Sequence, residues 1–177
     1  MKYQELYDEY NSYLNQYSSG KLELSTLPKG KIMKKRISGK EYNYLQFTSY
    51  GTRKTEYIKE SEIIDINHKL SRRETLINEI NLISKELTRL EQAVKILDSK
   101  MSRIFMYLRQ CADMDSLPIS KRIEAISFSN AIAALEGLTT SEETENGLKA
   151  WSEGKVTFAE FYLPILKMYR ILEVDNA

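Results

Sequence analysis

The sequence has little of three residue types that many functional sites depend on: one cysteine, one histidine and three prolines in 177 residues. Because Cys111 is alone, no disulfide can form within the chain, and we place the protein in a reducing cytoplasm. Because His68 is alone, no histidine pair is available to hold a metal. No apolar run approaches the roughly 20 residues of a membrane span, and the acidic, aromatic start is unlike a secretory signal.

Enzyme motifs are lacking as well. The sequence has no glycine-rich phosphate loop, no GxSxG segment and no cysteine pair for zinc. We therefore predict no catalytic residue, no metal and no cofactor, and a protein that acts by binding a partner away from the membrane.

Charge is unevenly distributed, although the net charge is only +1. Residues 29–59 hold nine basic and two acidic side chains, a net charge of +7, and residues 124–177 hold four basic and nine acidic ones, a net charge of −5. One part of the chain is suited to an anionic partner and the other to a cationic one. The alternative is two ordinary solvated surfaces.

A heptad pattern organises the middle of the chain. From Leu76 to Leu108 the apolar residues follow alternating steps of four and three, and neither proline nor glycine occurs between Thr52 and Leu117. This predicts one uninterrupted helix whose apolar stripe is covered by a helix of the same chain or of a second copy. In the second case the chain is a homodimer, with a coiled-coil seam of Leu76, Ile80, Ile83, Leu87, Leu90, Val94, Leu97 and Met101.

The first sixty residues combine a helix and a small sheet. Tyrosines recur at helical spacing from Tyr3 to Tyr17, and Ser18-Ser19-Gly20 is expected to end that helix. Strand-like runs then cover residues 31–37, 41–50 and 53–58, with glycine-bearing turns between them. Short turns between such runs predict an antiparallel meander.

The meander is basic and aromatic, a combination that binds nucleic acid through phosphate contacts and base stacking. Lys34, Lys35 and Arg36 are consecutive, however, so they point to both faces of their strand, which argues against a single basic face. The residues predicted to contact nucleic acid are Lys31, Lys34, Lys35, Arg36, Lys40, Arg53 and Lys54.

The run from Ile37 to Leu45, ISGKEYNYL, followed by Tyr57-Ile58, resembles small meander domains encoded beside transposases and other mobile-element genes. The resemblance covers about thirty residues of the region 29–59. Those domains are uncharacterised. The basic meander and the tyrosine stripe support an alternative function, a phage or mobile-element protein that binds nucleic acid or, like an anti-CRISPR protein, inhibits a host defence factor.

The last sixty residues predict a head of three short helices. The first runs from Ile119 to a C-terminal glycine at Gly137. Capping boxes at residues 140–143 and 157–160 open the other two, and Gly154 ends the second. Trp151 is the predicted core anchor. Gly147 falls inside the second helix and weakens that prediction.

Within this head, Leu135-Glu136-Gly137, Ser141-Glu142-Glu143, Trp151 and the segment from Gly154 to Glu160 carry a resemblance. Residues 131–161 resemble the VbhA-type antitoxin domain, the small inhibitor of Fic-family toxins. The resemblance implies that Glu136, followed by Gly137, pairs with an arginine in the toxin's nucleotide site. The glutamate then excludes the γ-phosphate of ATP, and transfer of AMP to target proteins stops.

The sequence departs from that family at one position. The family has a serine or threonine four residues before the glutamate, where this chain has Ile132, and Ser129 lies seven residues before it. The predicted partner-binding residues are therefore Glu136, Gly137, Ile132 and Ser129.

Together these patterns predict a mainly α fold with a small β-meander. The expected segments are a helix with a basic meander (1–60), a long coiled-coil connector (61–117) and an acidic antitoxin-like head (118–177). The predicted function is non-enzymatic, antitoxin-like inhibition of a protein such as a Fic-type toxin. The alternatives are the nucleic-acid or host-defence binder described above and a purely structural oligomer.

Overall fold

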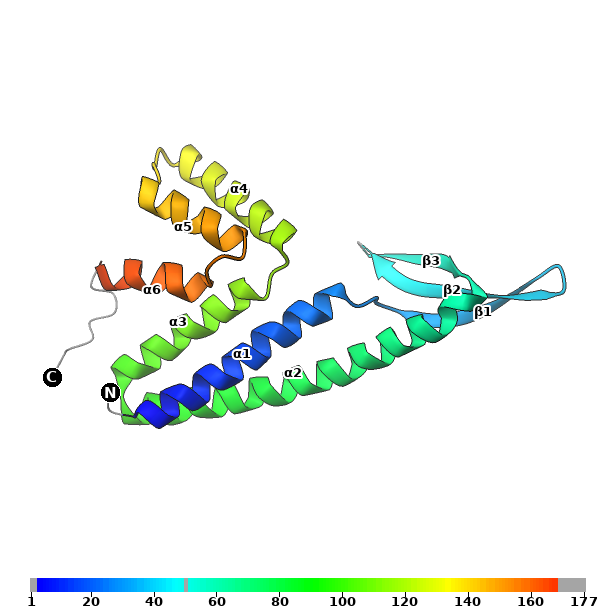
Figure 1. Cartoon of the computed structure of the whole chain (residues 1–177), viewed down its shortest axis with the longest axis horizontal. Coiled ribbons are helices and arrows are strands. Elements are labelled where there is room, and N and C mark those ends of the chain that lie inside the picture. Colours follow the sequence, from blue (N-terminus) through cyan, green and yellow to red (C-terminus); the bar gives the residue numbers. More distant parts are fainter. Residues whose placement is uncertain (1–2, 50, 169–177) are drawn as a thin grey trace. The chain divides into compact units, whose positions relative to one another are not determined.

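The computed structural model describes residues 3–49 and 51–168 and confirms a mainly helical fold with a small antiparallel sheet (Figure 1). A short 3-10 helix, Glu60–Glu62, follows the sheet. The other elements in the described part of the chain are α1 (Gln4–Thr26), β1 (Lys31–Ile37), β2 (Lys40–Ser49), β3 (Thr52–Ile58), α2 (Ile63–Leu97), α3 (Ser99–Asp115), α4 (Ile119–Leu135), α5 (Glu142–Ser152) and α6 (Phe158–Met168).

The chain divides into two compact units. The helical unit contains Met1–Ser25 and Leu82–Ala177, and the sheet unit contains Thr26–Asn81. These limits differ from the predicted segments 1–60, 61–117 and 118–177, because α1 folds with the helices that follow the sheet. Helix α2 belongs to the sheet unit up to Asn81 and to the helical unit from Leu82 onward.

The tyrosine stripe of α1 packs inside its own unit, against α3 and the C-terminal part of α2 (Figure 1). Tyr10 is fully buried and stacks on Phe105, with 3.9 Å between ring centroids. Its hydroxyl donates to Oε1 of Glu91 over 2.7 Å and to the Phe105 carbonyl over 3.0 Å. The hydroxyl of Tyr17 donates to Oδ1 of Asp113 over 3.0 Å. Each tyrosine thus buries an apolar ring and satisfies its polar end.

The prediction that α1 ends at Ser18-Ser19-Gly20 was wrong, because the helix continues to Thr26. Gly20 is buried, and Lys21, the next residue, donates from Nζ to Oδ1 of Asp113 over 2.7 Å. Contacts to α3 on both sides of the glycine offset the roughly 1 kcal/mol that glycine costs inside a helix.

The predicted uninterrupted helix from Leu76 to Leu108 was also wrong. Helix α2 ends at Leu97, and Asp98 adopts an extended backbone, with φ −158° and ψ 109°. Its carboxylate accepts hydrogen bonds from the backbone N–H groups of Lys100 (2.9 Å) and Met101 (3.0 Å), which caps the start of α3. Helix α3 then runs back along α2 (Figure 1).

This turn covers much of the predicted seam within one chain. Leu76, Leu87, Leu90, Val94 and Met101 are buried, Ile80 and Ile83 are half-buried, and Leu97 is 57% exposed. Phe105, Leu108 and Cys111 of α3 are also buried in the helical unit. Burial raises the pKa of the Cys111 thiol to about 12. Leu87, Leu90, Val94 and Met101 are therefore buried without a second copy, whereas Leu97 is not.

The three strands pair antiparallel in the order β1-β2-β3, as predicted. Ser38 and Gly39 link the paired residues Ile37 and Lys40, and both have positive φ (51° and 80°). A two-residue turn of this kind matches the twist of the strands that it joins. Tyr50, which was predicted to end the second strand, lies outside the described residues.

Candidate partner-binding surface

The candidate partner-binding surface lies on α4, in the group of helices that follows α3. Asp115, the last residue of α3, holds this group together. Its Oδ1 accepts hydrogen bonds from Nε1 of Trp151 over 2.9 Å and from the backbone N–H of Phe158 over 2.8 Å. Burial raises the pKa of the Asp115 carboxyl, while these two donors and the nearby Arg122 act in the opposite direction. One carboxylate thereby connects α3 to the end of α5 and the start of α6.

Arg122 fixes the start of α4 to the same point. It is buried, and its guanidinium donates to three backbone carbonyls: Leu117 from Nε (2.9 Å), Trp151 from Nη1 (3.0 Å) and Asp115 from Nη2 (2.7 Å). The guanidinium also lies 5.2 Å from the centroid of the fully buried Trp151 ring. Trp151 is thus the core anchor of the head, which consists of α4, α5 and α6.

Gly147 has a packing role that its position in the sequence did not reveal. It lies in the middle of α5, where the ring of Phe161 from α6 covers it. A Cβ atom at this position would be 2.2 Å from Cδ2 of Phe161. The glycine that weakened the helix prediction therefore allows α5 and α6 to approach closely.

Gly147→Ala is expected to destabilise the head by about 1–2 kcal/mol. The overlap with the Phe161 ring costs about 1–3 kcal/mol, and the gain in helix propensity returns at most about 1 kcal/mol. Urea unfolding followed by the fluorescence of Trp151, the single tryptophan, measures the difference. Combining the substitution with Phe161→Leu should recover part of the loss, and a single variant as stable as the wild type would contradict the packing role.

Helix α4 ends at the predicted glycine. Gly137 has φ 69°, and its N–H donates to the Ala134 carbonyl (3.2 Å) while that of Leu138 donates to Ala133 (2.8 Å). This is the Schellman arrangement. Glu136 is therefore the exposed C-cap residue, and no ion pair is found for it in the described part of the chain. At the negative end of the helix dipole, an unpaired carboxylate favours an incoming cation.

One side of α4 carries large apolar side chains that remain exposed. Phe128 is 71% exposed, Ile132 41% and Leu135 85%. Their spacing of four and three residues places them on one face of the helix, and we call these three residues the α4 stripe. Leu138, just beyond the helix, is 61% exposed. Contiguous exposed apolar side chains with polar surroundings are typical of a protein–protein contact.

The structure brings the predicted partner-binding residues together at the end of α4. Ser129, Ile132 and Glu136 are spaced three and four apart and are all exposed, and Gly137 follows directly. Sequence reasoning missed Phe128 and Leu135 as surface residues. Their spacing relative to Ile132 was nevertheless visible in the sequence.

Acidic side chains are also exposed at the start of α5. The N-cap of that helix is Ser141, one residue later than the predicted capping box at residues 140–143 implies, and its Oγ accepts from the N–H of Thr144 over 3.3 Å. Glu142, Glu143 and Glu145 follow in the first turn and are exposed. Together with Glu136 they give the head exposed negative charge on α4 and α5, which favours a partner with a basic surface.

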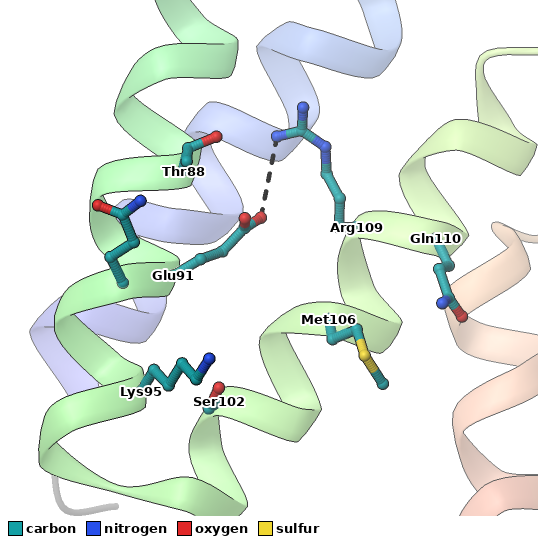
Figure 2. A pocket seen from close by; sticks show the side chains of 8 residues that line it. Thr88, Glu91, Lys95, Ser102, Met106, Arg109 and Gln110 are labelled. Carbon is teal, nitrogen blue, oxygen red and sulfur yellow. Dashed lines mark ion pairs between the residues drawn. The ribbon is translucent and has the colours of Figure 1, made fainter.

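A groove of about 390 Å³ lies between α2 and α3, and its eight lining side chains include Glu91, Lys95 and Arg109 (Figure 2). Nη2 of Arg109 donates to Oγ of Ser84 over 2.9 Å, and Nη1 lies 4.0 Å from Oε1 of Glu91. The guanidinium also lies 4.1 Å from the ring centroid of Tyr17. Arg109 and Glu91 thus join α1, α2 and α3 to one another, so we assign these two residues a structural role.

The sheet separates the seven predicted nucleic-acid contacts into two groups. Directly paired residues of neighbouring strands lie on the same face of a sheet, and faces alternate along a strand. The strand register therefore places Tyr42, Tyr44 and Tyr57 on one face, which we call the tyrosine face. Lys31, Lys35, Lys40 and Arg53 share the tyrosine face, whereas Lys34, Arg36 and Lys54 lie on the opposite one.

Within residues 3–49 and 51–168, no cluster of histidine, cysteine, aspartate or glutamate side chains is placed to hold a metal ion. Over the same ranges, no helix combines the length and apolarity needed to cross a membrane. Comparisons of the chain with family models, with curated proteins and with solved structures gave no match.

Proposed function

We propose that this protein is an antitoxin-like inhibitor that binds a basic partner protein through the end of α4. The observation that carries the proposal is Glu136, an exposed carboxylate without an ion pair in the described chain, at the end of a helix whose start is anchored by Arg122. By the resemblance of residues 131–161 to VbhA-type antitoxins, the partner is a Fic-type toxin.

In this proposal Glu136 pairs with an arginine in the partner's nucleotide site. A carboxylate–guanidinium pair is often bidentate and becomes stronger where water is excluded. The carboxylate would occupy the space of the ATP γ-phosphate and keep the nucleotide out of the geometry needed for AMP transfer. The chain supplies no reacting group and acts only by occupying the site.

The α4 stripe supplies the apolar part of the contact. Phe128 and Leu135, each more than two-thirds exposed, would leave water when the partner binds. At the position where the antitoxin family has a serine or threonine, this chain has Ile132, which belongs to the α4 stripe. Its aliphatic side chain would pack against the partner instead of donating a hydrogen bond. Because Asp115 and Arg122 already fix α4, binding orders few groups that are mobile in the free protein.

Glu136→Ala is expected to weaken binding to the partner toxin about 30-fold and to restore AMP transfer, since the partner's arginine loses its counter-charge in a desolvated site. The readouts are the inhibition constant for AMP transfer by the toxin of a neighbouring gene and the dissociation constant by calorimetry.

Glu153→Ala is the matched control. Glu153 caps the end of α5 with φ −85° and ψ −3°, close to the −86° and 1° of Glu136, and is likewise followed by a glycine with positive φ. Its carboxylate already pairs with Lys155 over 2.6 Å. This variant should inhibit as well as the wild type. Full inhibition by Glu136→Ala would refute the assignment of Glu136.

A further inference from the structure

The tyrosine face has a composition that the sheet does not need for its own stability. The apolar side chains that the sheet buries most, Leu45 and Ile58, lie on the opposite face. On the tyrosine face, Tyr57 is 56% exposed and Tyr42 and Tyr44 are half-buried. Three partly exposed aromatic rings are therefore gathered on the face that carries less of the core.

The three rings form one cluster. The ring centroid of Tyr57 lies 6.2 Å from that of Tyr42 and 5.8 Å from that of Tyr44, both in edge-to-face arrangements. Nζ of Lys35 lies 4.7 Å from the centroid of Tyr44 and within 3.5 Å of Oγ1 of Thr55. A lysine thus occupies one side of the cluster, while the exposed ring of Tyr57 remains accessible for stacking.

The charged strand residues of the tyrosine face are all basic. The two carboxylates of the strands, Glu41 and Glu56, both lie on the opposite face by register. Lys34, on that opposite face, lies 3.5 Å from the Glu41 carboxylate. The tyrosine face therefore carries four cations and, in the strand residues that the structure describes, no acidic group. Segregation of this kind attracts an anionic ligand to one face only.

We propose that the tyrosine face binds single-stranded nucleic acid. A base stacks on Tyr57, and the phosphates on either side contact Lys31, Lys35 and Arg53. Unpaired bases expose the π-faces that an aromatic cluster can use, whereas the bases of a duplex are stacked on one another. The carboxylates of an acidic protein would match the charge but do not stack on an aromatic ring, whereas a nucleotide supplies both an anionic phosphate and a planar base. This site belongs to the sheet unit and is independent of Glu136.

The first test uses the full chain and fluorescence anisotropy with 12-nucleotide DNA, RNA of the same sequence and the corresponding DNA duplex. The wild type should bind one or both single strands at least fivefold more tightly than the duplex. Tyr57→Thr, which keeps a strand-forming residue, should weaken single-strand binding about tenfold. Binding of DNA alone or of RNA alone would identify the natural ligand.

The second test compares two triple variants that remove the same charge. Replacing Lys31, Lys35 and Arg53 with glutamine should weaken binding more than tenfold and reduce the slope of log K against log salt by about 2, because each phosphate contact contributes about 0.7. Replacing Lys34, Arg36 and Lys54 with glutamine, on the opposite face, should change affinity less than threefold. Circular dichroism checks that both variants are folded.

Three results would overturn the proposal: no binding of any single strand at 50 mM salt, equal losses in the two triple variants, or duplex binding as tight as single-strand binding. Equal losses would show attraction to net charge alone. The inhibitory role of Glu136 is unaffected by any of these outcomes, because the Glu136→Ala assay measures AMP transfer by a protein partner.

Discussion

Asp115→Ala is expected to destabilise the head by about 3 kcal/mol, since a hydrogen bond to a charged group contributes about 1.5–3 kcal/mol and two such bonds are lost. The indole N–H of Trp151 and the backbone N–H of Phe158 would both lose their acceptor. The buried guanidinium of Arg122 would also lose the nearby negative charge. Trp151 fluorescence during urea unfolding should show the loss directly, because that side chain is fully buried.

Asp115→Asn is the informative control. The amide oxygen can still accept both hydrogen bonds, so this variant should lose much less stability than the alanine variant. Because burial raises the pKa of Asp115, ionising its carboxyl opposes folding. Its contribution to stability is therefore largest below the unfolded pKa of about 4 and falls as the pH rises towards the folded pKa. The asparagine variant should lack this decline, and equal destabilisation by both substitutions would contradict the role of the carboxylate as an acceptor.

Gly30→Ala is expected to destabilise the sheet unit by about 3 kcal/mol or more, from backbone strain of about 1–3 kcal/mol and steric overlap of similar size. Gly30 precedes β1 with φ 116°, a region that residues with a side chain rarely adopt. A Cβ atom there would lie 2.1 Å from the backbone carbonyl oxygen of Gln46. Because the obstructing atom belongs to the β2 backbone, no side-chain rotation can relieve the overlap.

Gly39→Ala is the control that separates the cost of backbone strain from the cost of steric overlap. Gly39, in the hairpin turn, also has positive φ, 80°, but a Cβ atom added there would meet no atom of the described chain within 4 Å. The substitution should cost about 1–2 kcal/mol, from the left-handed backbone alone. Hydrogen exchange of residues 31–58 measures both variants, and the helical unit serves as an internal reference. Equal protection in the Gly30 and Gly39 variants would show that the contact with Gln46 is unimportant.

The sequence predicted the features that depend on neighbouring residues. Gly137 marks a helix end by local hydrogen bonding, and Ser38-Gly39 marks a hairpin by local backbone preference. Trp151 was predicted as a core residue because of its size and position. What holds it, the hydrogen bond to Asp115 and the guanidinium of Arg122 over its ring, comes from other helices and was not foreseen.

The errors arose where tertiary contacts or a single residue outweighed a periodic pattern. The four-three spacing continues through Val94, Leu97 and Met101, although the helix is interrupted by Asp98. The clue was Asp98 itself, a strong N-cap residue within an otherwise helical run. Gly20 was expected to end α1, but packing against α3 carries the helix past it.

The sheet shows another limit of prediction from the sequence. The sequence indicated correctly that Lys34, Lys35 and Arg36 alternate between faces, and this argued against a nucleic-acid site. The register shows that the same alternation places both acidic strand residues, Glu41 and Glu56, on the face opposite the tyrosines. Residues of different strands are assigned to a common face only once the pairing is known.

The single cysteine has a practical consequence. Cys111 is 1% exposed within the helical unit, and because burial raises its pKa to about 12, its thiol remains protonated at neutral pH. Alkylating reagents attack the thiolate, so they can modify this chain only during moments when the packing around α3 opens. The rate of alkylation therefore measures how often that packing opens, and a partner that stabilises the helical unit would slow it without contacting the sulfur.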